Sequence, residues 1–194
     1  MSTFLESSVE GFLDEIAADT PAPGGGSVAA IVVAMAAGLA AMAARFSRDH
    51  WDDAAGIVAQ AESVRARVAP LAQEDAEAYE EVLAALRRPK AAEPEVRDRL
   101  LGDALSRAAE VPLRIVEAAA DVAELGALLA KHGNPNLRGD ATAASLLAAA
   151  AARAAANLVE INLGTTAEDE RVERARRLVD ACREAAEQAL AAGS

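Results

Sequence analysis

The sequence contains few of the residues on which disulfides, metal sites and β-sheets depend. Aromatic residues make up 3% of its 194 residues, cysteine occurs once, as Cys182, and there are two histidines. A single cysteine excludes a disulfide within the chain. His50 and His132 are far apart and lack metal-ligand spacing, so we expect no metal site. The chain also has no serine or cysteine nucleophile signature.

Basic residues are scarce as well. The chain has 19 Lys and Arg against 31 Asp and Glu, which gives a formal net charge of −12. Such a negative field repels nucleic acids and anionic membranes, so neither is expected as a partner. The N-terminus lacks the basic and apolar regions of a signal peptide. We therefore expect a cytoplasmic protein.

One uncharged apolar stretch, residues 27–44, approaches the minimum length of a membrane-spanning helix. It is dominated by alanine, which inserts into membranes poorly compared with Leu or Phe. We therefore predict that it is the buried central helix of a bundle.

Alanine, with some Leu and Val, supplies most of the 53% of residues that are hydrophobic. Alanine, Leu, Glu and Arg favour helices, whereas strand-forming residues are scarce. The composition predicts an all-α fold. Because the chain is long enough for one core but short for two, we expect a single domain over 1–194 with about six to eight helices.

Apolar periodicity and helix-breaking residues set the expected boundaries. Pro70 should kink or divide one helix, and Pro112 should separate two others. The expected helices cover 3–18, 28–46, 54–86 with the interruption at Pro70, from Pro94 towards Pro112, 111–131, 140–163, and from Thr165 or Thr166 to about 190.

A proline- and glycine-rich segment, residues 21–27, precedes the apolar helix. Gly24, Gly25 and Gly26 free the backbone, and Ser27 is an N-cap candidate. Backbone N–H groups at a helix start can hold a carboxylate, a phosphate or a developing oxyanion. No strand precedes the segment and no Gly-Lys-Ser/Thr follows it, so it is not a P-loop. The alternative is a tight turn that lets two helices pack closely.

A second polar loop, residues 133–140, contains Asn134, Asn136 and Asp140. Amides can bind the donor and acceptor edge of a heterocycle, and a carboxylate beside them could orient water or move a proton. The alternative is that these residues only form a turn and a helix cap, with Asp140 as the cap.

Polar residues also occur within two apolar helical stretches. Asp75 and Tyr79 share one helix face beside an apolar stripe, so Asp75 is a proton-transfer candidate, although it could simply be solvated. Asn157 and Asn162 lie in an apolar helix, where their amides must find partners: either a substrate or a neighbouring helix end.

Taken in order, these segments carry a resemblance to a known family. The order is Pro-x-Pro-Gly-Gly-Gly-Ser, Glu-Asp-Ala-x-Ala-Tyr, Arg-Arg-Pro-Lys, Val-Pro-Leu, Gly-Asn-x-Asn-x-x-x-Asp and Asn-Leu-Val-x-Ile-Asn-Leu. Across essentially its whole length the chain resembles the cyclodeaminase/cyclohydrolase family. Two family features differ: residues 45–51 replace a Tyr/Thr-Gly-Lys segment, and Gly139 stands where the family usually has Ser.

The resemblance implies an all-helical homodimer that acts on a tetrahydrofolate derivative without a metal. It implies that Gly24, Gly25, Gly26 and Ser27 line the folate site. It further implies substrate-binding or catalytic roles for a set of polar residues, with Asp140 the first candidate for proton transfer and Asp75 the second: Asn134, Asn136, Asn157, Asn162, Asp140 and Asp75.

Three functions remain open at this point. The first is hydrolysis of 5,10-methenyltetrahydrofolate to 10-formyltetrahydrofolate. The second is cyclisation of 5-formiminotetrahydrofolate with release of ammonia. The third is a non-catalytic helical dimer that binds folate or scaffolds a partner. Because the chain carries no formiminotransferase segment, the first is favoured. An enzyme of this type should contain a pocket with perturbed acids near a subunit interface.

Overall fold

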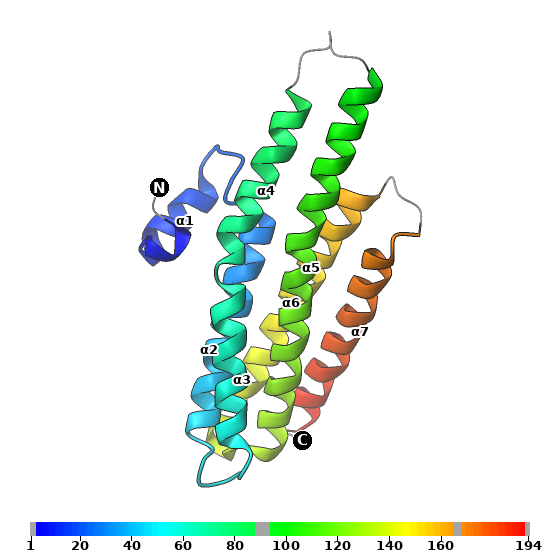
Figure 1. The fold of residues 1–194 in the computed structure, drawn as a ribbon. Coiled ribbons are helices and arrows are strands. Elements are labelled where there is room, and N and C mark those ends of the chain that lie inside the picture. Colours follow the sequence, from blue (N-terminus) through cyan, green and yellow to red (C-terminus); the bar gives the residue numbers. More distant parts are fainter. Residues whose placement is uncertain (1–2, 88–93, 165–167, 193–194) are drawn as a thin grey trace.

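The computed structural model describes residues 3–87, 94–164 and 168–192. Over these residues the chain forms seven α-helices and two short 3-10 helices, with no strand (Figure 1). The predicted all-α class is therefore confirmed, and the helix count lies within the predicted range.

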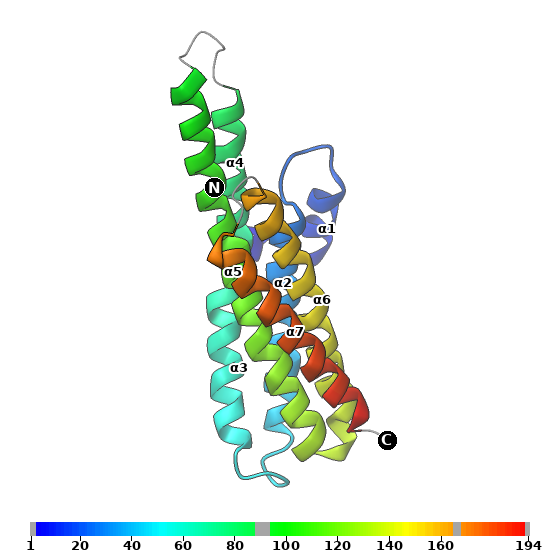
Figure 2. The same ribbon diagram turned by 90° about the vertical axis from the view of Figure 1, so that its right-hand side faces the viewer.

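Three helices form the centre of the bundle: α2 (Gly25–Arg45), α5 (Pro94–His132) and α6 (Arg138–Leu163). The pair α3 (Ala54–Val68) and α4 (Leu71–Leu86) lies along one side, and α7 (Glu170–Ala191) packs on α5 and α6 (Figure 2). At one end α4 and α5 extend past the other helices (Figure 1). The short α1 (Val9–Ala17) stands outside the bundle in both views.

The core consists mainly of alanine. One buried cluster runs through all helices from α2 to α7, with larger side chains such as Leu71, Ile115 and Leu129 at intervals. Alanine side chains bury little area each, but they let helices approach closely over long stretches. The bundle therefore depends on many small side-chain contacts between closely spaced helices.

Gly126 marks a close approach of α5 and α6. A Cβ added there would lie 2.8 Å from the Ala141 carbonyl oxygen and 2.8 Å from the Ser145 nitrogen. The Ser145 hydroxyl also donates to the Ala123 carbonyl at 2.9 Å, so the two helices are tied at the same level. Because both neighbours are backbone atoms, neither can move aside locally.

Replacing Gly126 with alanine should therefore destabilise the protein by about 1–3 kcal/mol, the usual cost of overpacking. Gly102, also within α5, is the matched control, because an added Cβ there meets no described atom within 4 Å. Gly102→Ala should be neutral or stabilise by up to about 1 kcal/mol through helix propensity. Urea denaturation of both variants measures the difference, and equal midpoints would contradict the packing argument.

Several predicted boundaries are wrong. The expected helix over 3–18 is a 3-10 turn, Phe4–Glu6, followed by α1, because the Ser8 side chain accepts from the Gly11 N–H and starts a new helix. Proline 112 does not separate two helices, since α5 runs unbroken through it. The last helix begins at Glu170 with Asp169 as its N-cap, and the predicted starts Thr165 and Thr166 lie outside the described residues. Pro70 divides α3 from α4 as expected.

Among the residues that the structure describes, two stretches are long and apolar enough to cross a membrane: Gly25–Arg45, with a mean hydropathy of 2.2, and Pro135–Leu163, with 1.3. In the bundle, 56% of the apolar window of the first is buried. Its buried side packs on α3, α5 and α6, as expected of a core helix in a bundle.

Candidate functional site

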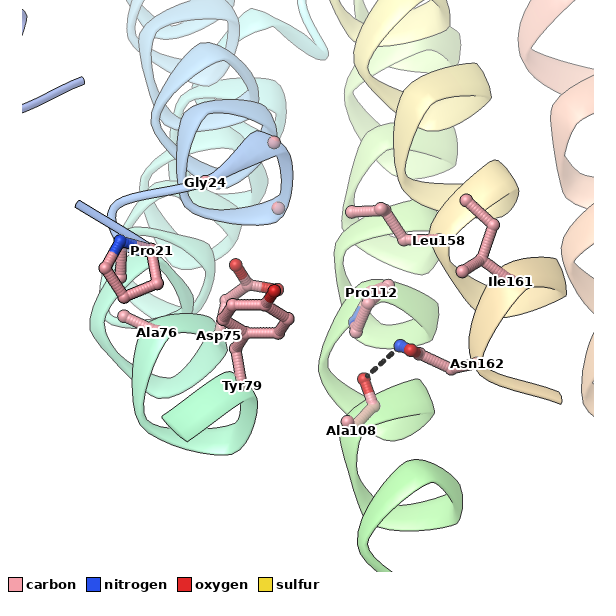
Figure 3. Close-up of a pocket in the computed structure, with 13 residues that line it drawn as sticks. Pro21, Gly24, Asp75, Ala76, Tyr79, Ala108, Pro112, Leu158, Ile161 and Asn162 are labelled. Atoms are coloured by element: carbon pink, nitrogen blue, oxygen red, sulfur yellow. Dashed lines mark hydrogen bonds between the residues drawn. The ribbon is translucent and has the colours of Figure 1, made fainter. Parts of the chain in front are cut away.

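A cavity of about 290 Å³ lies beside the N-terminus of α2, between α4, α5 and α6 (Figure 3). It gathers residues that are far apart in the sequence. The cavity is lined by Pro21, Ala22, Gly24, Gly25, Gly26, Asp75, Ala76, Tyr79, Ala108, Pro112, Leu158, Ile161 and Asn162. Five predicted site residues are thus brought together: the three glycines, Asp75 and Asn162.

Asp75 of α4 points at the first turn of α2 (Figure 3). A Cβ added at Gly26 would lie 2.0 Å from the Asp75 Oδ1 and 2.4 Å from its Cγ. The carboxyl group therefore occupies the space that any other residue at position 26 would fill. This close approach explains why the segment requires glycine at that position.

The environment of Asp75 favours its neutral form more than water does. Partial burial of the carboxyl raises the pKa of Asp75 above its ordinary value, while hydrogen bonds from Ser27 act in the opposite direction. The N-terminus of α2, with its free N–H groups, also supports the ionised form. A carboxyl held in this balance can take up and release a proton.

Ser27 is not the helix cap that the sequence suggested. Helix α2 begins at Gly25 with Gly24 as its N-cap, so Ser27 lies inside the first turn and is fully buried. Its hydroxyl donates to the Ala72 carbonyl at 2.8 Å and lies 3.2 Å from the Asp75 Oδ2. Ser27 therefore ties α2 to α4 and supports the carboxyl instead of lining the cavity.

Asn162 lies on the opposite side of the cavity from Asp75, and it also donates a hydrogen bond to the backbone of helix α5. Its Nδ2 donates to the Ala108 carbonyl at 3.1 Å (Figure 3). In a regular helix that carbonyl would accept from the N–H of residue 112, but a proline has none. The amide of Asn162 thus supplies the missing donor, and α5 continues through Pro112 without a break.

Asn162→Ala should consequently destabilise the protein by about 1–3 kcal/mol, the cost of leaving a buried carbonyl without a partner. In a Pro112→Ala background residue 112 has an N–H, so the same substitution should cost much less. A double-mutant cycle measured by urea denaturation gives this coupling. Equal costs in the two backgrounds would show that Asn162 does not act through the Ala108 carbonyl.

The loop that contains Asn134 and Asn136 lies at the other end of α2. The Asn134 N–H donates to the buried Ser47 Oγ at 2.8 Å, and its Nδ2 donates to the Phe46 carbonyl at 3.0 Å. Its Oδ1 accepts from the Asn136 N–H at 3.0 Å. Asn134 therefore holds the loop against the C-terminus of α2. This structural role corresponds to the alternative in which the loop residues form a turn and a cap.

Asp140 also lies at that end, in the first turn of α6. It is not the N-cap that the sequence suggested, because α6 begins at Arg138. Helix α2, with 21 residues, separates the two ends by about 30 Å. Within one chain, Asp140, Asn134 and Asn136 therefore do not meet Asp75.

Asn157 faces a different groove. It lies with Arg153, Glu160 and Arg176 between α6 and α7, away from the cavity of Asp75. Among the described residues, no group of three or more His, Cys, Asp or Glu is arranged to hold a metal ion.

Sequence reasoning missed several residues that line the cavity. Leu158 and Ile161 supply an apolar wall, and Pro112 and Ala108 belong to the neighbouring helix α5 (Figure 3). The sequence signal that could have identified this apolar wall was Asn162, because an amide so close to Leu158 and Ile161 on one helix indicates a polar group on an apolar surface. Nothing in the pattern indicated that Pro112 would face it.

Comparison with known proteins agrees with this architecture. Residues 8–181 match the family model described as formiminotransferase-cyclodeaminase. The chain belongs to the formiminotransferase-cyclodeaminase family. The resemblance inferred from the sequence is thereby confirmed.

Members of this family resemble the chain over different lengths. The methenyltetrahydrofolate cyclohydrolase of Methylorubrum extorquens is 32% identical over 163 residues, which cover 80% of this chain and 78% of that protein. The formimidoyltransferase-cyclodeaminase of Mus musculus is 36% identical over 124 residues, 59% of this chain but only 23% of that longer protein. The crystal structure of formiminotetrahydrofolate cyclodeaminase from Thermotoga maritima superposes with a TM-score of 0.84 at 30% identity, covering 97% of this chain and 98% of that one.

Proposed function

We propose that this chain, acting as one domain over residues 1–194, hydrolyses 5,10-methenyltetrahydrofolate to 10-formyltetrahydrofolate. One observation carries the proposal. In a chain of this family, Asp75, with a raised pKa, lies in a cavity beside the N-terminus of α2. This combination places a base next to the positive end of a fixed helix dipole.

The reaction needs both groups. Ionised Asp75 takes a proton from water as the water oxygen bonds to the methenyl carbon, and the cationic substrate becomes a neutral tetrahedral adduct. Protonated Asp75 then gives its proton to N5 as the bond between that carbon and N5 breaks. The hydroxyl loses its proton to solvent, which leaves a formyl group on N10. The N-terminus of α2 stabilises negative charge that develops on the added oxygen.

Other cavity residues suit the flat pterin ring. Tyr79 and Ile161 offer aromatic and apolar surface on opposite sides of the cavity (Figure 3). Asn162 uses its Nδ2 on the Ala108 carbonyl, so its oxygen remains the acceptor for ring N–H groups. A cavity of about 290 Å³ suits the ring system, and the benzoylglutamate tail would extend outside it.

The second candidate is cyclisation of 5-formiminotetrahydrofolate with release of ammonia. It is favoured by the near-complete superposition on a structure named formiminotetrahydrofolate cyclodeaminase. Both reactions pass through a tetrahedral carbon between two nitrogens, so Asp75 would serve in either. We also infer that the protein is a cytoplasmic homodimer that uses side-chain acids and fixed dipoles in place of a metal.

The test is the loss of 5,10-methenyltetrahydrofolate absorbance on adding purified protein, above the spontaneous rate. Enzyme-dependent loss would support the cyclohydrolase. No acceleration there, but ammonia release from 5-formiminotetrahydrofolate, would identify the cyclodeaminase. Inactivity on both, together with a higher melting temperature in the presence of folate analogues, would indicate a non-catalytic binder.

A further inference from the structure

Buried polar side chains are few in this bundle. Among the described residues three of them are buried, and all are serines: Ser27, Ser47 and Ser145. Each hydroxyl donates to the backbone carbonyl of an alanine, at 2.7–2.9 Å. Such a bond is expected, because a buried hydroxyl without a partner costs free energy. Ser27 differs from the other two, since a carboxyl group is a second acceptor within its reach.

The Ser27 hydroxyl lies between two oxygens of α4. Its Oγ is 2.8 Å from the Ala72 carbonyl oxygen and 3.2 Å from the Asp75 Oδ2. A hydroxyl carries one proton, so it donates to only one of these oxygens at a time. The Ala72 carbonyl lies inside α4, where its regular helical donor is the N–H of Ala76. That carbonyl therefore keeps a donor even when Ser27 turns away from it.

The protonation state of Asp75 decides which oxygen receives the hydroxyl proton. A neutral carboxyl with its proton on Oδ2 donates to the Ser27 Oγ, and the hydroxyl then donates onward to Ala72. An ionised carboxylate has no proton to donate, and it is a stronger acceptor than a neutral carbonyl. The hydroxyl therefore turns towards Asp75 when that residue is ionised. This turn rotates one O–H bond and moves no heavy atom.

Few other charges face Asp75. Helix α2 has no charged residue before Arg45. On α4, Tyr79 lines the same cavity, and Glu74 is ion-paired with Arg114 of α5. The residues that α5 and α6 contribute to the cavity do not titrate: Ala108, Pro112, Leu158, Ile161 and Asn162. Burial raises the pKa of Asp75, and the hydroxyl and backbone N–H of Ser27 lower it.

The two carboxyl oxygens of Asp75 have different surroundings. Oδ2 lies against Ser27, whereas Oδ1 has no side-chain partner among the described residues. Ser27 thus holds one oxygen in place and leaves the other available to the contents of the cavity. Ser27 itself is fully buried and does not line the cavity. Any effect of Ser27 on a reaction must therefore act through Asp75.

We propose that Ser27 is a positioning residue for Asp75: its hydroxyl turns from the Ala72 carbonyl to the Asp75 carboxylate when Asp75 loses its proton, and this bond extends to lower pH the range in which the base is ionised. The change of hydrogen bond is argued from the geometry alone, whereas its effect on turnover rests on the proposed function.

Carbon-detected NMR of the Asp75 carboxyl tests the change of hydrogen bond without relying on activity. The resonance is assigned by its absence from Asp75→Asn. In Ser27→Ala the carboxylate loses a donor, so Asp75 should titrate at a higher pH than in the wild type. Ser145→Ala is the matched control. Ser145 is equally buried and donates to the Ala123 carbonyl at 2.9 Å, but among the described residues no carboxyl is bonded to it, so the Asp75 titration should not change.

The pH dependence of stability provides a second measurement. At about pH 3 Asp75 is neutral, and Ser27→Ala removes bonds between neutral groups only. At pH 8 the substitution removes a bond to a charged group, which is the stronger kind. A higher folded-state pKa means a larger loss of stability as the pH rises, so the urea midpoint of Ser27→Ala should fall further at pH 8 than at pH 3. In an Asp75→Asn background, and in Ser145→Ala, the loss should be equal at both pH values.

In turnover, the change of hydrogen bond predicts an altered pH profile instead of a uniform loss. Ser27→Ala should reduce kcat/KM for 5,10-methenyltetrahydrofolate about tenfold at the acid end of the profile, the usual difference between a charged and a neutral hydrogen bond. The reduction at pH 8 should be much smaller. Ser27→Thr keeps the hydroxyl and should restore the wild-type profile, whereas Ser145→Ala should leave the shape of the profile unchanged.

Each outcome has a definite meaning. A higher titration of Asp75 in Ser27→Ala, with a stability loss that grows with pH, supports the proposal. An unchanged titration, or an equal loss at both pH values, would show that Ser27 only ties α2 to α4 and would overturn it. If Ser27→Ala does not fold, Ser27→Cys, whose thiol is a weaker donor, should show the same upward titration. If the wild type turns over neither substrate, the proposed function fails, but the NMR titration still decides the role of Ser27.

Discussion

Asp75→Asn is expected to lower kcat for 5,10-methenyltetrahydrofolate hydrolysis by about 10³-fold, within the range for removal of a general base. The asparagine side chain has nearly the same shape, so the cavity and its contact with Gly26 should persist. What disappears is the ability to take a proton from water and return it to N5. Steady-state kinetics on the purified variant, with circular dichroism to verify the fold, measure this effect.

The same substitution should not reduce stability at neutral pH. Burial raises the pKa of Asp75 in the folded state, so the neutral carboxyl is the form that the fold favours. Its contribution to stability is complete below the ordinary pKa of 3.8 and is lost as the pH rises through the folded-state value. Asp75→Asn should therefore unfold at an equal or higher denaturant concentration at pH 7, and this advantage should vanish near pH 3.

Glu77→Gln is the matched control for Asp75→Asn. Glu77 lies two residues further along α4, is exposed, and accepts a hydrogen bond from the Gln73 side chain at 3.1 Å. Its replacement should change kcat less than twofold. An Asp75→Asn protein as active as this control would remove Asp75 from the mechanism.

Gly26→Ala is expected to reduce turnover by about 10²-fold and to destabilise the fold by about 1–3 kcal/mol. The new methyl group would overlap the Asp75 carboxyl, whose atoms lie 2.0–2.6 Å from the Cβ position. The carboxyl must then rotate away, and it loses both its place beside the helix terminus and its hydrogen bond from Ser27. Kinetics and urea denaturation on one preparation report both effects.

The adjacent glycine provides the control. A Cβ at Gly25 would meet only the Leu158 Cδ1, at 4.0 Å, which is an ordinary contact. Gly25→Ala should therefore keep the stability of the wild type and lose less than tenfold in turnover. If the two alanine variants behaved alike, the close approach of Asp75 would not be the reason for glycine at position 26.

The helical class and most helix positions followed from local information. Alanine-rich apolar periodicity is a property of each segment, and Pro70 ends a helix because of its own ring. Pro112 has the same ring, yet α5 continues through it. The difference is the amide of Asn162, which lies 54 positions along the chain from the Ala108 carbonyl that it binds, so no local rule could have separated the two prolines.

The candidate site was predicted in part. The glycines, Asp75 and Asn162 share one cavity. They could be selected as candidates because each has a chemical character that is visible in the sequence. Ser27 was misassigned because the helix starts three residues earlier than its N-cap pattern suggested, at Gly25 instead of Val28. Asn134 and Asp140 were grouped with Asp75 because sequence order gives no information on which end of a bundle a loop occupies.

The hydrogen bond from Asn162 to the Ala108 carbonyl has an evolutionary consequence. The bond makes positions 112 and 162 depend on each other, since helix α5 needs the amide donor only where residue 112 lacks an N–H. Relatives that keep proline at the first position should keep an amide or hydroxyl donor at the second. In lineages where proline has been lost, helix α5 no longer constrains position 162, and only the bound substrate would then select the residue there.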